Sequence, residues 1–239
     1  MNRFKIPLLI ALAFMLHVCL LAYGINKFFY TDASFQLSSH HYNIYFCIYA
    51  FAATLRPVLM ILLSWYLCRE SGLRESSFLS VPKMPWKDIL LGIVAVAVFR
   101  FYATPFMIWI TGKSSVPGFP GITILLSETM RNLHIYTEAF FCVSDVIIGP
   151  IGEEVLYRGY IHTLIKKHFG FLPAIVIVSG LFSLSHWPVL GMSWWNFSQQ
   201  FIMGIILGIL RESSGGILAP IATHQVKNLL VVLFRIKVL

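Results

Sequence analysis

The sequence is built around apolar runs long enough to cross a lipid bilayer, which takes about 20 mostly apolar residues in a helix. Such runs occur at residues 6–24, 43–68, 88–111, 133–167, 171–187, 197–210 and 216–234. Charged residues make up only 12% of the chain, roughly half the share found in soluble domains. The sequence therefore predicts an all-α, polytopic membrane helix bundle with about seven transmembrane helices, in a range of about six to eight.

Basic residues flank these runs and do not gather in a stripe, although the net charge is +8. Scattered lysines and arginines at helix ends set membrane topology, whereas a nucleic-acid interface needs a concentrated basic patch. More of these cations fall on the inner side when the N-terminus is placed in the cytoplasm. We therefore expect a multi-pass cell-membrane protein with a cytoplasmic N-terminus, surrounded by the lipid bilayer and without a nucleic-acid partner.

The run at 133–167 is too long for one straight span, and Gly149-Pro150 lies inside it. Proline removes a backbone donor and clashes with the preceding turn, so the helix should kink or break there. Two glutamates, Glu153 and Glu154, follow this point closely. The chain thus divides into N-terminal transmembrane helices without a recognised motif, residues 1–132, and a motif-bearing membrane domain, residues 133–239.

The glutamate pair lies in apolar surroundings, where each ionisable group costs at least ~2.5–3.5 kcal/mol and needs a reason to be present. Glu154 and Arg158 are four residues apart, share a helix face and can form an ion pair. Glu153 is left without an obvious local partner, which leaves it available as a general base. A solvated helix cap is the simpler interpretation of two adjacent glutamates, but the apolar segment disfavours it.

Three further polar residues, His186, His224 and Asn228, lie deep in apolar runs. Counted from the basic helix ends at ~1.5 Å per residue, Glu153, His186 and Asn228 lie about 21 to 24 Å deep, and His224 about one turn lower. Side chains from three segments are therefore predicted to meet in one layer. A carboxylate and an imidazole can activate a water, and an imidazole with an amide can stabilise an oxyanion, as peptide hydrolysis requires.

These residues form three motifs in chain order: Glu153-Glu154-Val-Leu-Tyr-Arg158, Phe182-Ser-Leu-Ser-His186 and His224-Gln-Val-Lys-Asn228. They resemble the EExxxR, FxxxH and HxxxN patterns of the CPBP membrane proteases, which include type II CAAX prenyl endopeptidases and bacteriocin-processing relatives. The resemblance implies that Glu153 is the general base and His186 its partner in activating water. It also implies that His224 and Asn228 stabilise the oxyanion, and that Glu154 with Arg158 braces the site. Residues 133–239 would then be a CPBP-like catalytic membrane domain.

A metal-dependent version of the same protease is left open by these residue types. Glu153, His186 and His224 could then bind a divalent metal such as zinc. Neither HExxH nor another zincin signature is present in the sequence. We therefore prefer water activation without a cofactor, because glutamate and histidine suffice as base and partner.

Three cations fall outside these assigned roles. Arg56 and Arg100 lie in apolar runs, and we expect structural ion pairs, for example with Asp145 or Glu138, in preference to binding a substrate carboxylate. Lys227 is an extra cation inside the third motif and departs from the resemblance. We expect it to pair with another helix or to extend toward the interface.

The predicted function is an intramembrane endopeptidase that cleaves a membrane-delivered protein or peptide, including lipid-modified or membrane-anchored substrates. A non-catalytic immunity or scaffold protein that retains the fold is an alternative, although it predicts decay of the motif residues, which are all intact. A transporter would favour paired half-sequence repeats, which the sequence lacks.

Overall fold

The computed structural model describes residues 10, 39–73, 85–99, 101, 140, 142–186 and 194–236. Within these residues the regular structure is helical and contains no strand, which confirms the predicted all-α class. Apart from Ile10, the predicted run at 6–24 lies outside the described residues, as do Arg100 and Glu138. None of the helices described is both long and apolar enough to qualify as a membrane span, so the number of spans stays a prediction.

The order of the helices follows the predicted runs closely. They are α2 (Ser39–Glu70), α4 (Trp86–Val98), α7 (Gly149–Glu154), α8 (His162–Phe169), α9 (Phe171–His186), α10 (Trp194–Ser214) and α11 (Leu218–Ile236), with π-helical segments η2 (Cys142–Ile148) and η3 (Val155–Ile161) on either side of α7. Gly170 separates α8 from α9 at a φ of 88°, and Gly215 separates α10 from α11 at a φ of 67°. Such left-handed dihedrals favour glycine at a helix end.

The predicted break at Gly149-Pro150 does not occur. Residues 142–169 form a continuous helical run through η2, α7, η3 and α8, and Ile148 keeps helical dihedrals. Pro150 falls in the first turn of α7, where the preceding turn is π-helical and the missing N–H of proline is tolerated. The chain therefore changes its helical winding just before the glutamates, and π-helical turns of this kind are frequent at functional sites.

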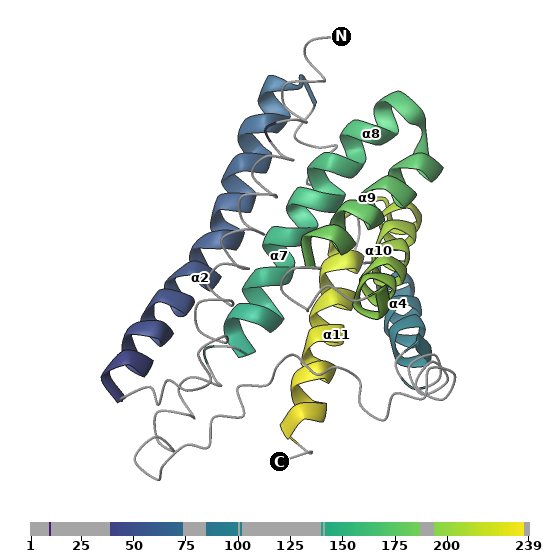
Figure 1. The fold of residues 1–239 in the computed structure, drawn as a ribbon. Helices are drawn as coiled ribbons and strands as arrows, with labels where there is room; N and C mark the ends of the chain where they lie inside the picture. Colours follow the sequence, from purple (N-terminus) through teal and green to yellow (C-terminus); the bar gives the residue numbers. More distant parts are fainter. Residues whose placement is uncertain are drawn as a thin grey trace.

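Helix α2 likewise continues through a proline, Pro57, inside the predicted run at 43–68. It lies along α7 and η3 (Figure 1). Gly152 provides the close approach, since a Cβ at this position would lie only 2.5 Å from Pro57 Cα. The N-terminal part of the chain is therefore in direct contact with the segment that carries the glutamates.

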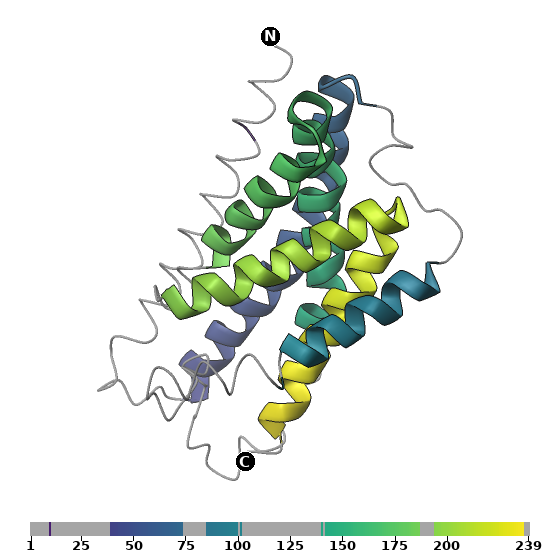
Figure 2. The same ribbon diagram turned by 90° about the vertical axis from the view of Figure 1, so that its right-hand side faces the viewer.

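Two apolar clusters hold the helices together. One joins α2, η3, α8 and α9 around Leu67, Leu156 and Phe182. The other joins α4, α10 and α11 around Val96 and Leu207, and Figure 2 shows α4 crossing α11 with α10 beside it. Because α11 also packs on α7, the three motif-bearing helices α7, α9 and α11 come together between these clusters (Figure 1).

Candidate active site

Glu153 is buried on α7, and its two carboxylate oxygens have different surroundings. Oε1 accepts a hydrogen bond of 2.6 Å from Nη2 of Arg56 on α2. Oε2 lies 3.7 Å from Nε2 of His186 on α9 and 3.9 Å from Nε2 of His224 on α11. These two separations are too long for direct hydrogen bonds, but they suit a small oxygen ligand held between the three atoms.

The sequence offered Glu153 no obvious local partner, and the structure supplies a distant one, Arg56, which lies 97 positions away on another helix. A structural ion pair was expected for Arg56, for example with Asp145 or Glu138, and the structure shows one with Glu153. The sequence marked Arg56 only as a cation in an apolar run. Which carboxylate it reaches depends on the contact between α2 and α7, which no motif spacing reveals.

Glu154 is fully buried and connects three helical elements. Its Oε1 accepts hydrogen bonds from Arg158 Nη1 at 3.1 Å and from His224 Nδ1 at 2.9 Å. The predicted pair between Glu154 and Arg158 is therefore confirmed. Arg158 also donates from Nη2 to the carbonyl oxygen of Gly204 on α10 at 3.2 Å, and its guanidinium lies 4.6 Å from the centre of the Phe182 ring. The buried arginine thus ties η3 to α7, α9 and α10.

The hydrogen bonds of the two histidines fix which ring nitrogens carry protons. His186 Nδ1 lies 2.8 Å from the carbonyl oxygen of Phe182, which can only accept, so Nδ1 carries a proton. His224 Nδ1 similarly donates to the carboxylate of Glu154. Both imidazoles therefore present Nε2 to Oε2 of Glu153, with a lone pair on Nε2 whenever the ring is neutral.

Asn228, the second predicted oxyanion donor, lies about one helical turn beyond His224 on α11. Its Nδ2 donates to the backbone oxygen of Asp145 in η2 at 2.7 Å. This hydrogen bond fastens α11 to the segment before the glutamates. The structure thus joins five of the six predicted site residues in one contact network, which comprises Glu153, Glu154, Arg158, His186 and His224, while the contact shown for Asn228 is with η2.

Tyr157 and Ser185 support His186, although neither is among the site residues predicted from the sequence. Tyr157 donates from its hydroxyl to Ser185 Oγ at 2.7 Å. Ser185 in turn donates to the carbonyl oxygen of Phe182 at 2.8 Å and lies 3.3 Å from His186 Nδ1. Both residues occupy variable positions inside the motifs, and the available signal was a hydroxyl group in an otherwise apolar helix.

Glu212, near the end of α10, connects α10 to α8. It accepts hydrogen bonds from His162 Nε2 at 2.9 Å and from Lys166 Nζ at 2.6 Å. Partial burial raises the pKa of Glu212, but the hydrogen bonds from Lys166 and His162 outweigh burial and hold the pKa below its usual value. The neighbouring Arg211 donates to the backbone oxygen of Arg158 at 3.2 Å, so this end of α10 also supports the arginine of the first motif.

Within the part of the chain that the structure describes, no group of three or more His, Cys, Asp or Glu side chains is arranged to hold a metal ion. Glu153, His186 and His224, the ligands of the metal-dependent alternative, do not form such a group. Arg56 engages one carboxylate oxygen of Glu153, and Glu154 engages Nδ1 of His224. Both contacts leave the facing atoms, Oε2 of Glu153 and Nε2 of His224, to a ligand, so the metal-dependent version stays a prediction.

Comparison with known proteins agrees with the motifs. Residues 135–230 match the family model described as type II CAAX prenyl endopeptidase Rce1-like, which confirms the resemblance to the CPBP family over the three motifs. An Escherichia coli protein described as an uncharacterized 24.3 kDa protein is 25% identical over 154 residues, which are 63% of this chain and 64% of that relative. This chain therefore spans a little under two thirds of that relative. No solved structure matches the chain significantly.

Proposed function

We propose that the protein is a CAAX-type intramembrane endopeptidase in which Glu153 and His186 activate water for peptide-bond hydrolysis. One observation carries the proposal: Glu153 Oε2 lies 3.7 and 3.9 Å from Nε2 atoms of histidines on two other helices. A carboxylate oxygen and two imidazole nitrogens around one point can bind, orient and deprotonate a water. The family match over residues 135–230 supports the same reaction class.

Water activation follows from the orientation of Glu153 and His186. Arg56 occupies Oε1 of Glu153, so Oε2 is the oxygen that receives a proton from the water. His186 donates from Nδ1 to a backbone oxygen, so its Nε2 accepts the second hydrogen bond of that water. The water oxygen bonds to the substrate carbonyl carbon as its proton moves to Oε2 and the carbonyl oxygen becomes an oxyanion. Collapse of this oxyanion breaks the C–N bond, and Glu153 passes its proton to the leaving amine.

Oxyanion stabilisation is the proposed role of His224. Its Nδ1 proton is donated to Glu154, so Nε2 can donate to an oxyanion only when the ring carries both protons. The carboxylate of Glu154, which also accepts a hydrogen bond from Arg158, holds the His224 ring with Nε2 toward Glu153. Asn228, about one turn further along α11, is the proposed second donor.

The proposed substrate is a protein or peptide that reaches the site from the bilayer, with lipid-modified or membrane-anchored chains included. Large apolar side chains on the outer faces of α4 and α9 support a lipid environment; they include Leu90, Val94, Leu172 and Val176. Leu90 and Val94 share one exposed face of α4, and Leu172 and Val176 share one of α9, an arrangement that is unusual for a protein surrounded by water. A non-catalytic immunity or scaffold protein is the alternative, and a metal-dependent version of the protease is a second.

Cleavage of reporter peptides by the full-length protein in lipid nanodiscs tests the proposal. We expect wild-type protein to cleave and both Glu153→Gln and Glu153→Ala to lose at least ~100-fold in kcat, the loss typical of a removed general base. Full activity in both variants would reject the mechanism, and no cleavage of any peptide by wild type would favour the non-catalytic alternative. Loss of wild-type activity with a strong chelator would instead indicate the metal-dependent version.

A further inference from the structure

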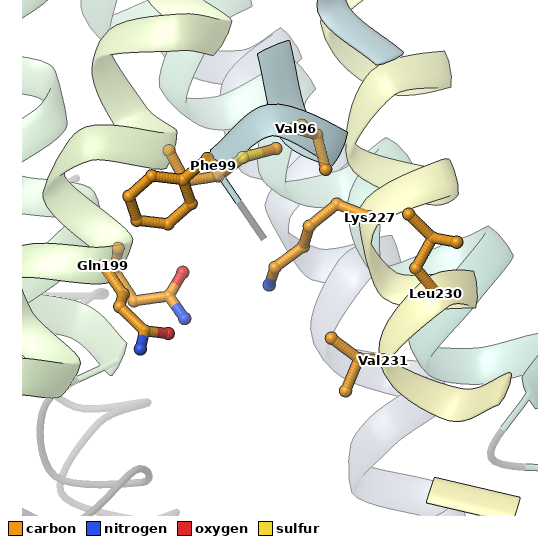
Figure 3. Close-up of a pocket in the computed structure, with 8 residues that line it drawn as sticks. Val96, Phe99, Gln199, Lys227, Leu230 and Val231 are labelled. Carbon is orange, nitrogen blue, oxygen red and sulfur yellow. The ribbon is translucent and has the colours of Figure 1, made fainter. Parts of the chain in front are cut away.

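A cavity of about 60 Å³ lies between α4, α10 and α11, and the proposed mechanism does not use it (Figure 3). Its wall is largely apolar, formed by Val96, Phe99, Met203, Leu230 and Val231. Among the described residues, three polar side chains line it, Gln199 and Gln200 of α10 and Lys227 of α11. An apolar pocket with a few convergent polar groups is the usual form of a site for a small ligand group.

The two glutamines place unsatisfied polar atoms at this cavity. Gln200 is only 9% exposed, and its Oε1 is buried without a hydrogen-bond partner among the described residues. Nε2 of Gln199 is also buried without a hydrogen-bond partner among the described residues. Burying such a group without a partner is unfavourable, so a ligand that satisfies both atoms would be stabilised here.

Lys227 adds a positive charge between these amides and the proposed catalytic groups. Figure 3 shows its side chain extending from α11 toward the space in front of Gln199. Lys227 follows His224 by three residues, or about 4.5 Å along the helix axis. Its ammonium also lies close enough to interact electrostatically with Glu153 and His186. The cavity is therefore next to the site where the peptide bond would be cleaved.

We propose that this cavity binds a carboxylate group of the substrate and thereby fixes which peptide bond reaches Glu153. The assignment rests on the proposed protease function and names a feature of its substrate. Lys227 and the Gln199 amide donate to the carboxylate, because charge-assisted hydrogen bonds are the strongest such contacts available. Gln200 Oε1 accepts from a neighbouring peptide N–H of the substrate.

Size and charge both favour a carboxylate. A cavity of about 150 Å³ accommodates benzene, so about 60 Å³ admits a small planar group but not a large side chain. One ammonium balances one negative charge, whereas a doubly charged phosphate would keep an uncompensated charge between apolar walls. The carboxylate can come from the C-terminus of the substrate or from an aspartate or glutamate side chain near the cleavage point.

Binding measurements separate this proposal from the cleavage reaction. The full-length Glu153→Gln protein in phosphatidylcholine nanodiscs is titrated with three fluorescein-labelled peptides of otherwise equal sequence. The first ends in leucine with a free carboxylate, the second has a C-terminal carboxamide, and the third has the carboxamide and one internal glutamate. Fluorescence anisotropy gives the Kd of each, and the thermal unfolding of every variant establishes that it is folded.

We expect a carboxylate peptide to bind at least ~10-fold more tightly than the uncharged peptide, as one charge-assisted hydrogen bond would give. Adding Lys227→Met or Gln199→Leu should reduce or abolish this preference, and Lys227→Arg should retain most of it. Lys167→Met, which removes an exposed lysine on α8, is the matched control and should change nothing. Tighter binding of the first peptide would identify a terminal carboxylate as the ligand, and tighter binding of the third peptide would identify a side-chain carboxylate.

Equal binding of all three peptides, absence of binding, or a preference that survives in the folded Lys227→Met protein would overturn the proposal. Cleavage by the wild-type protein is measured in parallel. A Lys227-dependent preference without any cleavage would reject the proposed protease while retaining the carboxylate site. Cleavage with no carboxylate preference would reject the site alone.

Discussion

Gly152 of α7 packs against Pro57 of α2 so closely that a Cβ at position 152 would lie 2.5 Å from the Pro57 Cα and 2.8 Å from its carbonyl oxygen. The next residue on α7 is Glu153, and the preceding residue on α2 is Arg56, and these two pair at 2.6 Å. The close backbone contact therefore sets the distance over which the arginine reaches the proposed base. Only glycine permits this contact.

Gly152→Ala should separate α2 from α7, because the added Cβ meets backbone atoms that cannot move aside as a flexible side chain would. We expect a loss of stability of about 1–3 kcal/mol, as for other overpacked sites, and a clear fall in peptide cleavage. Thermal unfolding and cleavage rates measure the two effects.

The matched control is Gly180→Ala in α9. A Cβ there meets no heavy atom within 4 Å among the described residues, so this variant should keep its activity and gain up to about 1 kcal/mol. An equal loss of stability and of cleavage rate in the Gly152→Ala and Gly180→Ala variants would show that the contact with Pro57 has no special role.

Arg56→Met removes the cation that holds Oε1 of Glu153. Charge-assisted hydrogen bonds contribute about 1.5–3 kcal/mol, which corresponds to a fall in kcat of about 10- to 150-fold if the bond orients the base in the transition state. Steady-state kinetics of Arg56→Met and Arg56→Lys provide the comparison, and Arg56→Lys should recover part of the rate. A changed KM with an unchanged kcat would instead indicate that Arg56 binds substrate.

Much of the fold was predictable, because the apolar runs at 171–187, 197–210 and 216–234 correspond to α9, α10 and α11. Hydrophobicity over a long window reports where a helix lies without knowledge of its neighbours. Proline was less informative. Pro150 was expected to kink or break its helix, yet the helical run continues through it after a π-helical turn, and α2 likewise continues through Pro57. Neighbouring helices decide whether a proline ends a helix, and a single sequence does not identify those neighbours.

The site was predictable where partners share a helix or a depth. The pairing of Glu154 with Arg158 follows from a spacing of four residues, and the meeting of Glu153 with His186 agrees with their similar predicted depth. His224, predicted about one turn lower, meets Glu153 as well. The contact with Arg56 was not predictable in the same way, because it depends on how α2 lies against α7. Depth along a helix constrains one coordinate only, and rotation about the axis decides which side chains touch.

Glu212 should make stability depend on acidic pH. Its pKa is lowered in the folded protein by Lys166 and His162, so its contribution is present above the unfolded-state pKa and is lost as the pH falls through the lowered folded pKa. Thermal unfolding of the wild type and of Glu212→Gln tests this pH dependence. The measurements run from pH 3 to 7, a range that includes the ordinary glutamate pKa of about 4.3. The wild type should be the more stable at neutral pH, and the difference should shrink toward pH 3. A difference independent of pH would contradict the assignment.

Glu153 and Glu154 should respond differently to the same substitution, although they are adjacent. Glu153→Gln keeps a side chain of equal size beside a partly exposed arginine, so we expect a folded but inactive protein. Glu154→Gln leaves the fully buried Arg158 and His224 without their shared carboxylate, and breaking a buried pair typically costs about 3–5 kcal/mol. Thermal unfolding of both variants in nanodiscs separates the two roles. If Glu153→Gln were the more destabilised of the two, the assignment of chemistry to Glu153 and of bracing to Glu154 would be reversed.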